Sequence, residues 1–148
     1  MDKLKAILVD DEQDSRQILS NYLSKYCPIV ELLAECKNIQ EGLSAIQKHQ
    51  PDLVFLDIEM PYGTGFDLLE QVGEVNFETI FVTAYDNYAI QALNMSAAYY
   101  LLKPIDIDEL VDAVEKVHVE KSQNKDSFHV QVLLDNIKYE NERPKKIM

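Results

Sequence analysis

Residues 53–57, Leu53-Val54-Phe55-Leu56-Asp57, join four large apolar side chains to one aspartate. A short run that is apolar at every position is typical of a strand buried on both faces of a parallel sheet. In such a sheet the carboxyl ends of the strands leave the core at one edge, where polar groups meet solvent. The stretch therefore predicts a central parallel strand that delivers Asp57 to this edge.

Similar runs recur along the chain and predict five strands that alternate with five helices. Asn38 and Asp106 have the residue type and the position of helix N-caps. Alternation of strands and helices implies right-handed crossovers and a parallel sheet covered on both faces. The predicted fold class is α/β, a doubly wound sandwich. Strands are expected at residues 4–9, 29–34, 53–56, 79–82 and 98–102, and helices at residues 13–25, 39–49, 66–72, 88–95 and 107–121.

The composition favours one domain with a buried core, because 47% of the 148 residues are hydrophobic. The 14 basic and 26 acidic residues give a formal net charge of -12, which disfavours nonspecific attraction to nucleic acid or to an anionic membrane. No run approaches the roughly 18 apolar residues of a membrane span, and the N-terminus lacks the apolar core of a signal peptide. We therefore expect a soluble, cytoplasmic chain that makes no DNA contact of its own.

The two cysteines, Cys27 and Cys36, lack the paired spacing of a zinc site. In a chain without a signal peptide they are expected to be reduced and buried. The sequence alone leaves a disulfide between them open.

Polar residues follow four of the predicted strands and belong to one edge of the sheet. They are Asp10 and Asp11, then Asp57, Thr83 and Lys103. Three carboxylates and one ammonium sum to -3 + 1 = -2, so a cation is expected among them. Mg²⁺ suits oxygen ligands and shares sites with phosphate, whereas the dense ligand loop of a helix-loop-helix calcium site is missing from the sequence.

These groups suit phosphoryl transfer onto a carboxylate, which depends on positioning and on neutralisation of charge. Asp57 is the candidate phosphoacceptor. Mg²⁺ held by Asp11 and Asp57 would neutralise one phosphoryl oxygen and Lys103 a second, while the Thr83 hydroxyl would donate to the third. Alone, the Asp10-Asp11 pair is equally well explained as a helix N-terminal cap, and its convergence with Asp57 favours the site.

Four motifs, in order and at compatible spacing, resemble the receiver domains of two-component response regulators. The resemblance covers residues 1–121 and implies a flavodoxin-like sheet with the strand order 2-1-3-4-5. It also implies that Asp11, Asp57 and the backbone carbonyl of Glu59 bind Mg²⁺ directly, that Asp10 acts through a metal-bound water, and that a sensor histidine kinase donates the phosphoryl group. The motifs are Val9-Asp10-Asp11-Glu12, Leu56-Asp57-Ile58-Glu59-Met60-Pro61, Val82-Thr83-Ala84 and Leu102-Lys103-Pro104, and in the last of them the resemblance implies a cis peptide between Lys103 and Pro104.

Residues 81–89 and 99–104 look like the branch of this family whose receivers precede a LytTR-type DNA-binding domain. Residues 122–148 are then expected to be a linker, in part helical, that leads to an output domain missing from this chain. In the full-length protein this output domain would bind DNA and regulate transcription.

A phosphoryl group on Asp57 is expected to draw Thr83 toward it. By resemblance, Tyr100, which stands three residues before Lys103, then moves inward. The responding surface would comprise residues 88–95, 98–102 and 107–121 and would mediate homodimerisation or contact with the output domain.

Glu59 and Tyr85 stand two residues beyond Asp57 and Thr83. They are expected to flank the path of the water that hydrolyses the aspartyl phosphate, so a bulky Tyr85 would lengthen the lifetime of the phosphorylated state.

Two other functions stay open. A phosphatase of the haloacid dehalogenase type also uses a strand-end Asp, Mg²⁺, a Thr and a Lys, but it needs a second Asp two residues after the nucleophile, where this chain has Glu12 or Glu59. A receiver that takes no phosphate and serves only as a dimerisation module is the second alternative. The favoured hypothesis is that the chain is not an enzyme that acts on other substrates. It would catalyse only its own aspartyl phosphorylation and dephosphorylation.

Overall fold

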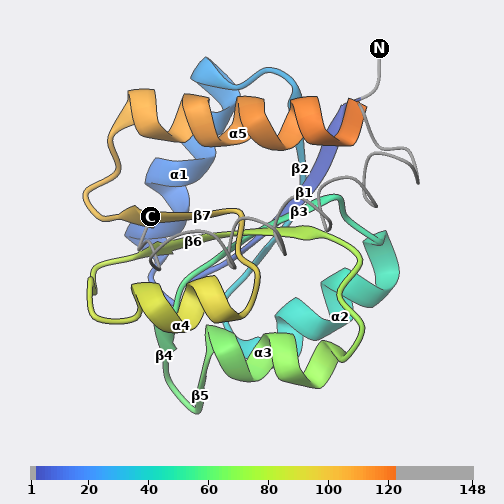
Figure 1. Ribbon diagram of the computed structural model, residues 1–148, viewed down its shortest axis with the longest axis vertical. Helices are drawn as coiled ribbons and strands as arrows, with labels where there is room; N and C mark the ends of the chain where they lie inside the picture. The colour runs from blue at the N-terminus through green and yellow to red at the C-terminus, as the bar shows by residue number, and fades with distance from the viewer. Residues whose placement is uncertain (1–2, 123–148) are drawn as a thin grey trace, which may run out of the picture.

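A five-stranded parallel sheet lies between two layers of helices in the computed structural model, which describes residues 3–122 (Figure 1). The strands pair in the order β2-β1-β3-β6-β7, which confirms the flavodoxin-like order and the α/β class expected from the sequence. The sheet consists of β1 (Leu4–Val9), β2 (Val30–Cys36), β3 (Leu53–Leu56), β6 (Glu78–Thr83) and β7 (Tyr99–Leu102).

The five helices divide between the two faces of the sheet (Figure 1). One face is covered by α1 (Gln13–Tyr26) and α5 (Ile107–Ser122). The other is covered by α2 (Ile39–His49), α3 (Gly65–Val72) and α4 (Ala89–Asn94). The crossovers between parallel strands account for this division, because each helix returns the chain across one face.

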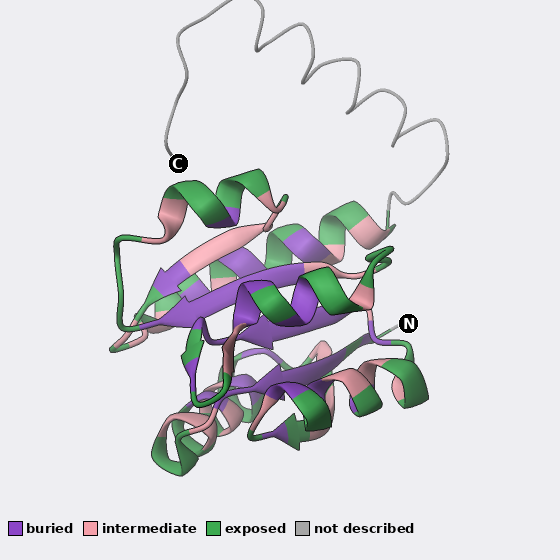
Figure 2. Ribbon diagram, turned by 90° about the horizontal axis from the view of Figure 1, so that it is seen from below, coloured by how far each residue is buried: buried purple, intermediate pink, exposed green. Residues whose placement is uncertain are grey.

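The central strand β3 serves both cores at once. Leu53 and Phe55 pack with α1 and α5, whereas Val54 and Leu56 pack with the helices on the opposite face. All four side chains are 0% exposed. This alternation explains why the strand reads as an uninterrupted apolar run, and Figure 2 shows the strands buried between helices whose outer sides are exposed.

Side-chain N-caps begin two of the helices at the residues that the sequence predicts. The Asn38 side chain accepts a hydrogen bond from the backbone N–H of Glu41 at 2.8 Å, and Asp106 accepts one from Glu109 at 3.1 Å. The Glu41 carboxylate accepts from the backbone N–H of Lys37 at 3.0 Å, rather than from that of the cap residue. Both predicted N-caps are therefore confirmed.

The segment between the predicted strand at residues 53–56 and the predicted helix at residues 66–72 contains a small antiparallel hairpin. It pairs β4 (Glu59–Met60) with β5 (Gly63–Thr64), and it begins two residues after Asp57. Strands of two residues are too short to show a period in the sequence, so no pattern could have predicted them. The hairpin ends in a capping box between Thr64 and Asp67, which begins α3.

Cys27 and Cys36 are both free, and each is 3% exposed. Cys27 lies in the core under α1 and α5, whereas Cys36 lies in the core on the opposite face of the sheet. Burial raises the pKa of the Cys36 thiol to about 11. The structure thus supports two buried thiols and no disulfide.

The segment predicted as a linker falls almost entirely outside the described residues. Ser122 is the last residue of α5, and residues 123–148 are not described. Within residues 3–122, no helix is long and apolar enough to cross a membrane.

Candidate functional site

Four strands bring the predicted site residues to one edge of the sheet. Asp10 and Asp11 follow β1, Asp57 follows β3, Thr83 ends β6 and Lys103 follows β7. Backbone hydrogen bonds of 2.8 to 2.9 Å continue the parallel pairing past the strand ends and fix Asp10, Asp57 and Lys103. The site is therefore held by the sheet itself rather than by a free loop.

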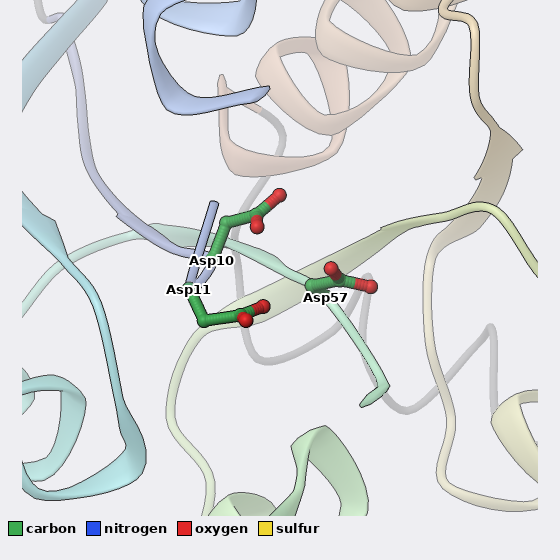
Figure 3. Close-up of side chains that lie close together, drawn as sticks. All are labelled: Asp10, Asp11 and Asp57. Carbon is green, nitrogen blue, oxygen red and sulfur yellow. The ribbon is translucent and has the colours of Figure 1, made fainter. Parts of the chain in front are cut away.

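The three aspartates converge. Asp10, Asp11 and Asp57 each have a carboxylate oxygen within 4.8 Å of an oxygen of the other two. Figure 3 shows their carboxylates projecting into the same space from the ends of β1 and β3. Asp10 is 3% exposed and Asp57 is 6% exposed, while Asp11 is half-buried. Such a cluster is unfavourable unless positive charge compensates it.

Lys103 supplies part of that charge. Its Nζ donates to Asp10 Oδ2 at 2.8 Å, to Ser15 Oγ at 3.1 Å and to Asp57 Oδ2 at 3.2 Å. The Glu12 carboxylate lies 3.6 Å away. Burial alone would lower the pKa of Lys103, but the hydrogen bond from its ammonium to Asp10 and the charges of Asp57 and Asp10 outweigh it, so the pKa is raised. The side chain therefore stays an ammonium.

The environment of Asp57 opposes its ionisation. Burial and the negative charge of Asp10 raise the pKa of Asp57, and they outweigh the lowering by Lys103 and by the backbone N–H of Ile58. That N–H donates to Asp57 Oδ1 at 2.7 Å. One lysine thus compensates the acidic cluster only in part.

The remaining charge fits a divalent cation. Lys103 pairs with Asp10 and Asp57, whereas Asp11 makes no ion pair with any residue in the described part of the chain. The cluster offers only oxygen donors, which is the ligand set that Mg²⁺ prefers. The donor chemistry and the uncompensated carboxylate both suit a magnesium ion.

The backbone of Tyr85 connects Thr83 to Tyr100 through two hydrogen bonds. Thr83 is 0% exposed, and its Oγ1 accepts from the backbone N–H of Tyr85 at 3.4 Å. The Tyr100 hydroxyl donates to the carbonyl oxygen of the same Tyr85. The Tyr100 ring is half-buried, with its centroid 6.3 Å from that of Phe81. A displacement of Thr83 would therefore act on Tyr100 through Tyr85.

The peptide bond between Lys103 and Pro104 is cis, as the resemblance implies.

Glu59 and Tyr85 lie at the rim of the site. Glu59 is exposed, and the Tyr85 side chain is 44% exposed. The Glu59 carboxylate accepts a hydrogen bond from the Tyr88 hydroxyl at 2.6 Å. No pattern in one sequence signals this side-chain contact, because the two residues are 29 positions apart.

Two residues of α1 were also missed. Besides the contact of Ser15 with Lys103, a guanidinium nitrogen of Arg16 donates to the backbone oxygen of Asp10 at 2.7 Å. Both residues sit on the first turn of α1, which packs beside the end of β1. Their positions follow from tertiary packing, for which the sequence holds no local signal.

The chain matches the family model described as the response regulator receiver domain over residues 6–115. It belongs to the receiver-domain family of response regulators. Receiver domains generally bind Mg²⁺ at an acidic pocket, and the partner of a receiver domain in a two-component system is a histidine kinase.

Among curated proteins, the receiver is 40% identical over 135 residues to a response regulatory protein of Vibrio cholerae, covering 90% of this chain and 56% of that protein. It is also 40% identical over 124 residues to the transcriptional regulatory protein BtsR of Escherichia coli, covering 81% of this chain and 50% of BtsR. The chain thus spans about half the length of these relatives.

Among solved structures, the receiver resembles the response regulatory domain of protein mrkE from Klebsiella pneumoniae. The TM-score is 0.75 at 25% identity, and the match covers 82% of this chain and 100% of that domain. The described fold is therefore that of a whole receiver domain.

Gly65 permits the close approach of α3 to the end of β3. A Cβ at this position would lie 2.5 Å from the backbone oxygen of Asp57 and 2.9 Å from Leu56 Cγ. We expect Gly65→Ala to cost about 1 to 3 kcal/mol of stability through overpacking, and to weaken Mg²⁺ binding because Asp57 must shift. Urea unfolding and Mg²⁺ titration measure the two effects.

Gly73→Ala is the matched control. Its φ of +80 strains any other residue, but a Cβ there meets nothing within 4 Å. This variant should lose stability yet keep wild-type Mg²⁺ affinity, and equal affinities in the two variants would contradict the role of Gly65.

Proposed function

We propose that this receiver is the phosphorylation switch of a cytoplasmic two-component pathway. Asp57 would accept a phosphoryl group from the phosphohistidine of a sensor histidine kinase. The observation that carries the proposal is the convergence of Asp10, Asp11 and Asp57, with the Lys103 ammonium donating to Asp10 and Asp57.

The residues for Mg²⁺ follow from the acidic cluster. Asp11 and Asp57 would bind the ion directly together with the backbone carbonyl of Glu59, and Asp10 would act through a bound water. When bound, Mg²⁺ supplies positive charge to the carboxylates and to the incoming phosphoryl oxygens.

In the transfer step, a carboxylate oxygen of Asp57 forms a bond to phosphorus while the phosphorus–nitrogen bond of the donor histidine breaks. Lys103 neutralises one phosphoryl oxygen by charge, and Thr83 donates its hydroxyl hydrogen to another. Lys103 already donates to Asp57 at 3.2 Å, and Thr83 ends β6 at the same edge, from which it would turn toward the phosphoryl group.

The signal would leave the site through Tyr85. When Thr83 turns toward the phosphoryl group, the hydrogen bond from the backbone N–H of Tyr85 to its oxygen weakens. The carbonyl of Tyr85 holds the Tyr100 hydroxyl, so Tyr100 would respond. A coupling of this kind is typically worth about 1 to 3 kcal/mol, which is enough to bias two packings of one surface.

The responding surface would be the α4-β7-α5 face. Ile90 is 56% exposed, Leu93 is 37% exposed and Leu102 is 42% exposed. Helix α4, with the sequence AIQALN, carries no charged residue. Exposed apolar side chains on an uncharged helix favour a protein partner, so we propose a phosphorylation-dependent homodimer or a contact with an output domain.

The output would be transcriptional in the full-length protein. The match covers only about half the length of the curated relatives, and the relative from Escherichia coli is a transcriptional regulatory protein. Residues 81–89 and 99–104 look like receivers that precede a LytTR-type domain, so we propose a DNA-binding domain of that type after residues 122–148.

Incubation with acetyl phosphate and Mg²⁺ tests the phosphoacceptor. We expect wild type to incorporate one phosphoryl group per chain and Asp57→Asn to incorporate none, measured by mass spectrometry or radiolabel, because an amide cannot form the acyl phosphate. Tyr85→Ala should label normally and lose phosphate faster, since it opens the rim to water.

Absence of label in wild type would favour the dimerisation module that takes no phosphate. Turnover of an aryl phosphate by wild type would favour the phosphatase of the haloacid dehalogenase type.

Sedimentation of the beryllofluoride-treated protein tests the surface. We expect treated wild type to dimerise and Ile90→Glu to stay monomeric, because a buried charge opposes association at an apolar interface. Ile18→Glu on α1, where the native side chain is 47% exposed, should dimerise as wild type does. No mass change in wild type, or equal loss in both variants, would rule out this face.

A further inference from the structure

The Glu59 carboxylate is held by a side chain outside the proposed phosphorylation site. The Tyr88 hydroxyl donates to Glu59 Oε2 at 2.6 Å and joins segments 29 residues apart. Glu59 begins the hairpin of β4 and β5, two residues after Asp57. Tyr88 is the N-cap residue of α4. The bond therefore ties the loop after the phosphoacceptor to the start of the proposed output surface.

The position of the Tyr88 hydroxyl is set by ring packing. The ring centroid lies 5.9 Å from that of Phe66 and 6.3 Å, edge on, from that of Tyr85. Phe66 in turn packs against Phe81 in the core, with 5.1 Å between the ring centroids. These contacts restrict the rotamers of Tyr88, so its hydroxyl is presented to Glu59 in a fixed place.

The hydrogen bond between Tyr88 and Glu59 is also stronger than a hydrogen bond between two neutral groups. A hydroxyl that donates to a carboxylate makes a charge-assisted hydrogen bond, which is shorter and stronger than a neutral one. The hydrogen bond to Glu59 raises the pKa of Tyr88, so the phenol keeps the proton that it donates. Glu59 is exposed, and without this contact its carboxylate would be free to move.

We propose that Tyr88 is a positioning residue that keeps the Glu59 carboxylate away from the water that hydrolyses the aspartyl phosphate, and so prolongs the phosphorylated state. The inference rests on the proposed phosphorylation of Asp57. It assigns Tyr88 a role in the lifetime of the signal, in addition to Tyr85 at the same rim.

Loss of phosphate requires a water oxygen to attack phosphorus in line with the bond to Asp57. That phosphorus–oxygen bond breaks, Asp57 recovers its carboxylate, inorganic phosphate leaves and the proton of the water passes to solvent. A nearby carboxylate that accepts a hydrogen bond from this water would hold it in the attacking orientation. Glu59 stands two residues from Asp57, and its hydrogen bond with Tyr88 competes with that contact.

A double-mutant cycle tests the proposal. Wild type, Tyr88→Phe, Glu59→Ala and the double variant are labelled with radioactive acetyl phosphate and Mg²⁺, freed of donor and followed as phosphate is lost. We expect Tyr88→Phe to lose phosphate about fivefold faster, the factor that one hydrogen bond of ordinary net strength is worth. In the Glu59→Ala background, Tyr88→Phe should have no further effect.

Phenylalanine keeps the ring contacts with Phe66 and Tyr85, so the urea midpoint of Tyr88→Phe should equal that of wild type. Tyr26→Phe removes a phenol hydroxyl from α1 and should leave the decay rate unchanged. An equal acceleration by Tyr88→Phe in both backgrounds would show a structural effect and overturn the proposal.

Two outcomes distinguish the role of Tyr88 from the proposed phosphorylation of Asp57. If wild type is labelled but Tyr88→Phe loses phosphate at the wild-type rate or more slowly, the role of Tyr88 is wrong and the proposed function stands. If wild type takes no label, both are wrong.

Discussion

Three aspartate carboxylates cluster beside the Lys103 ammonium at the edge of the sheet, and the proposed function depends on this excess of negative charge. Lys103 reaches Asp10 and Asp57 but leaves Asp11 without an ion pair among the described residues. At an effective dielectric constant of about 20, two charges no more than 4.8 Å apart repel each other by at least about 3.5 kcal/mol. This repulsion at a largely buried site is the reason why we propose that a divalent cation binds there and allows a phosphoryl group to follow. In this proposal the cation supplies the missing positive charge and also offsets the negative charge that the phosphoryl group adds.

The parallel sheet makes this arrangement possible, because it brings residues distant in sequence to one edge without a dedicated loop. The hydrogen-bond ladder continues past the strand ends and fixes the backbone on both sides of the pocket. Two hydrogen-bonded connections link this rigid site to the surface of the domain. The backbone of Tyr85 joins Thr83 to Tyr100, and the Tyr88 hydroxyl joins Glu59 to the first residues of α4. Both connections lead from the carboxyl edge of the sheet, one to the N-cap residue of α4 and the other to β7.

Much of this could be predicted from the sequence. Apolar runs that end in polar residues gave the strands, their alternation with helices gave the layers, and the carboxyl-edge rule placed Asp57 and Lys103 in one pocket. The hairpin of β4 and β5 could not be predicted, since its strands are too short to carry a period. The hydrogen bonds of Ser15 and Tyr88 could not be predicted either, because they join side chains that are far apart in the sequence. They depend on rotamers that no local pattern specifies. Sequence periodicity thus predicts backbone placement well and side-chain partnerships poorly.

Thermal unfolding of wild type and Asp11→Asn, with and without Mg²⁺, tests the charge imbalance most directly. Without divalent ions, Asp11→Asn should unfold at a higher temperature than wild type, because the relief of repulsion exceeds the roughly 0.3 to 1 kcal/mol that an acidic group contributes near a helix N-terminus. Mg²⁺ should raise the midpoint of wild type, since it binds only the folded state, and should raise that of Asp11→Asn much less. A lower midpoint for metal-free Asp11→Asn, together with equal responses to Mg²⁺, would contradict the account.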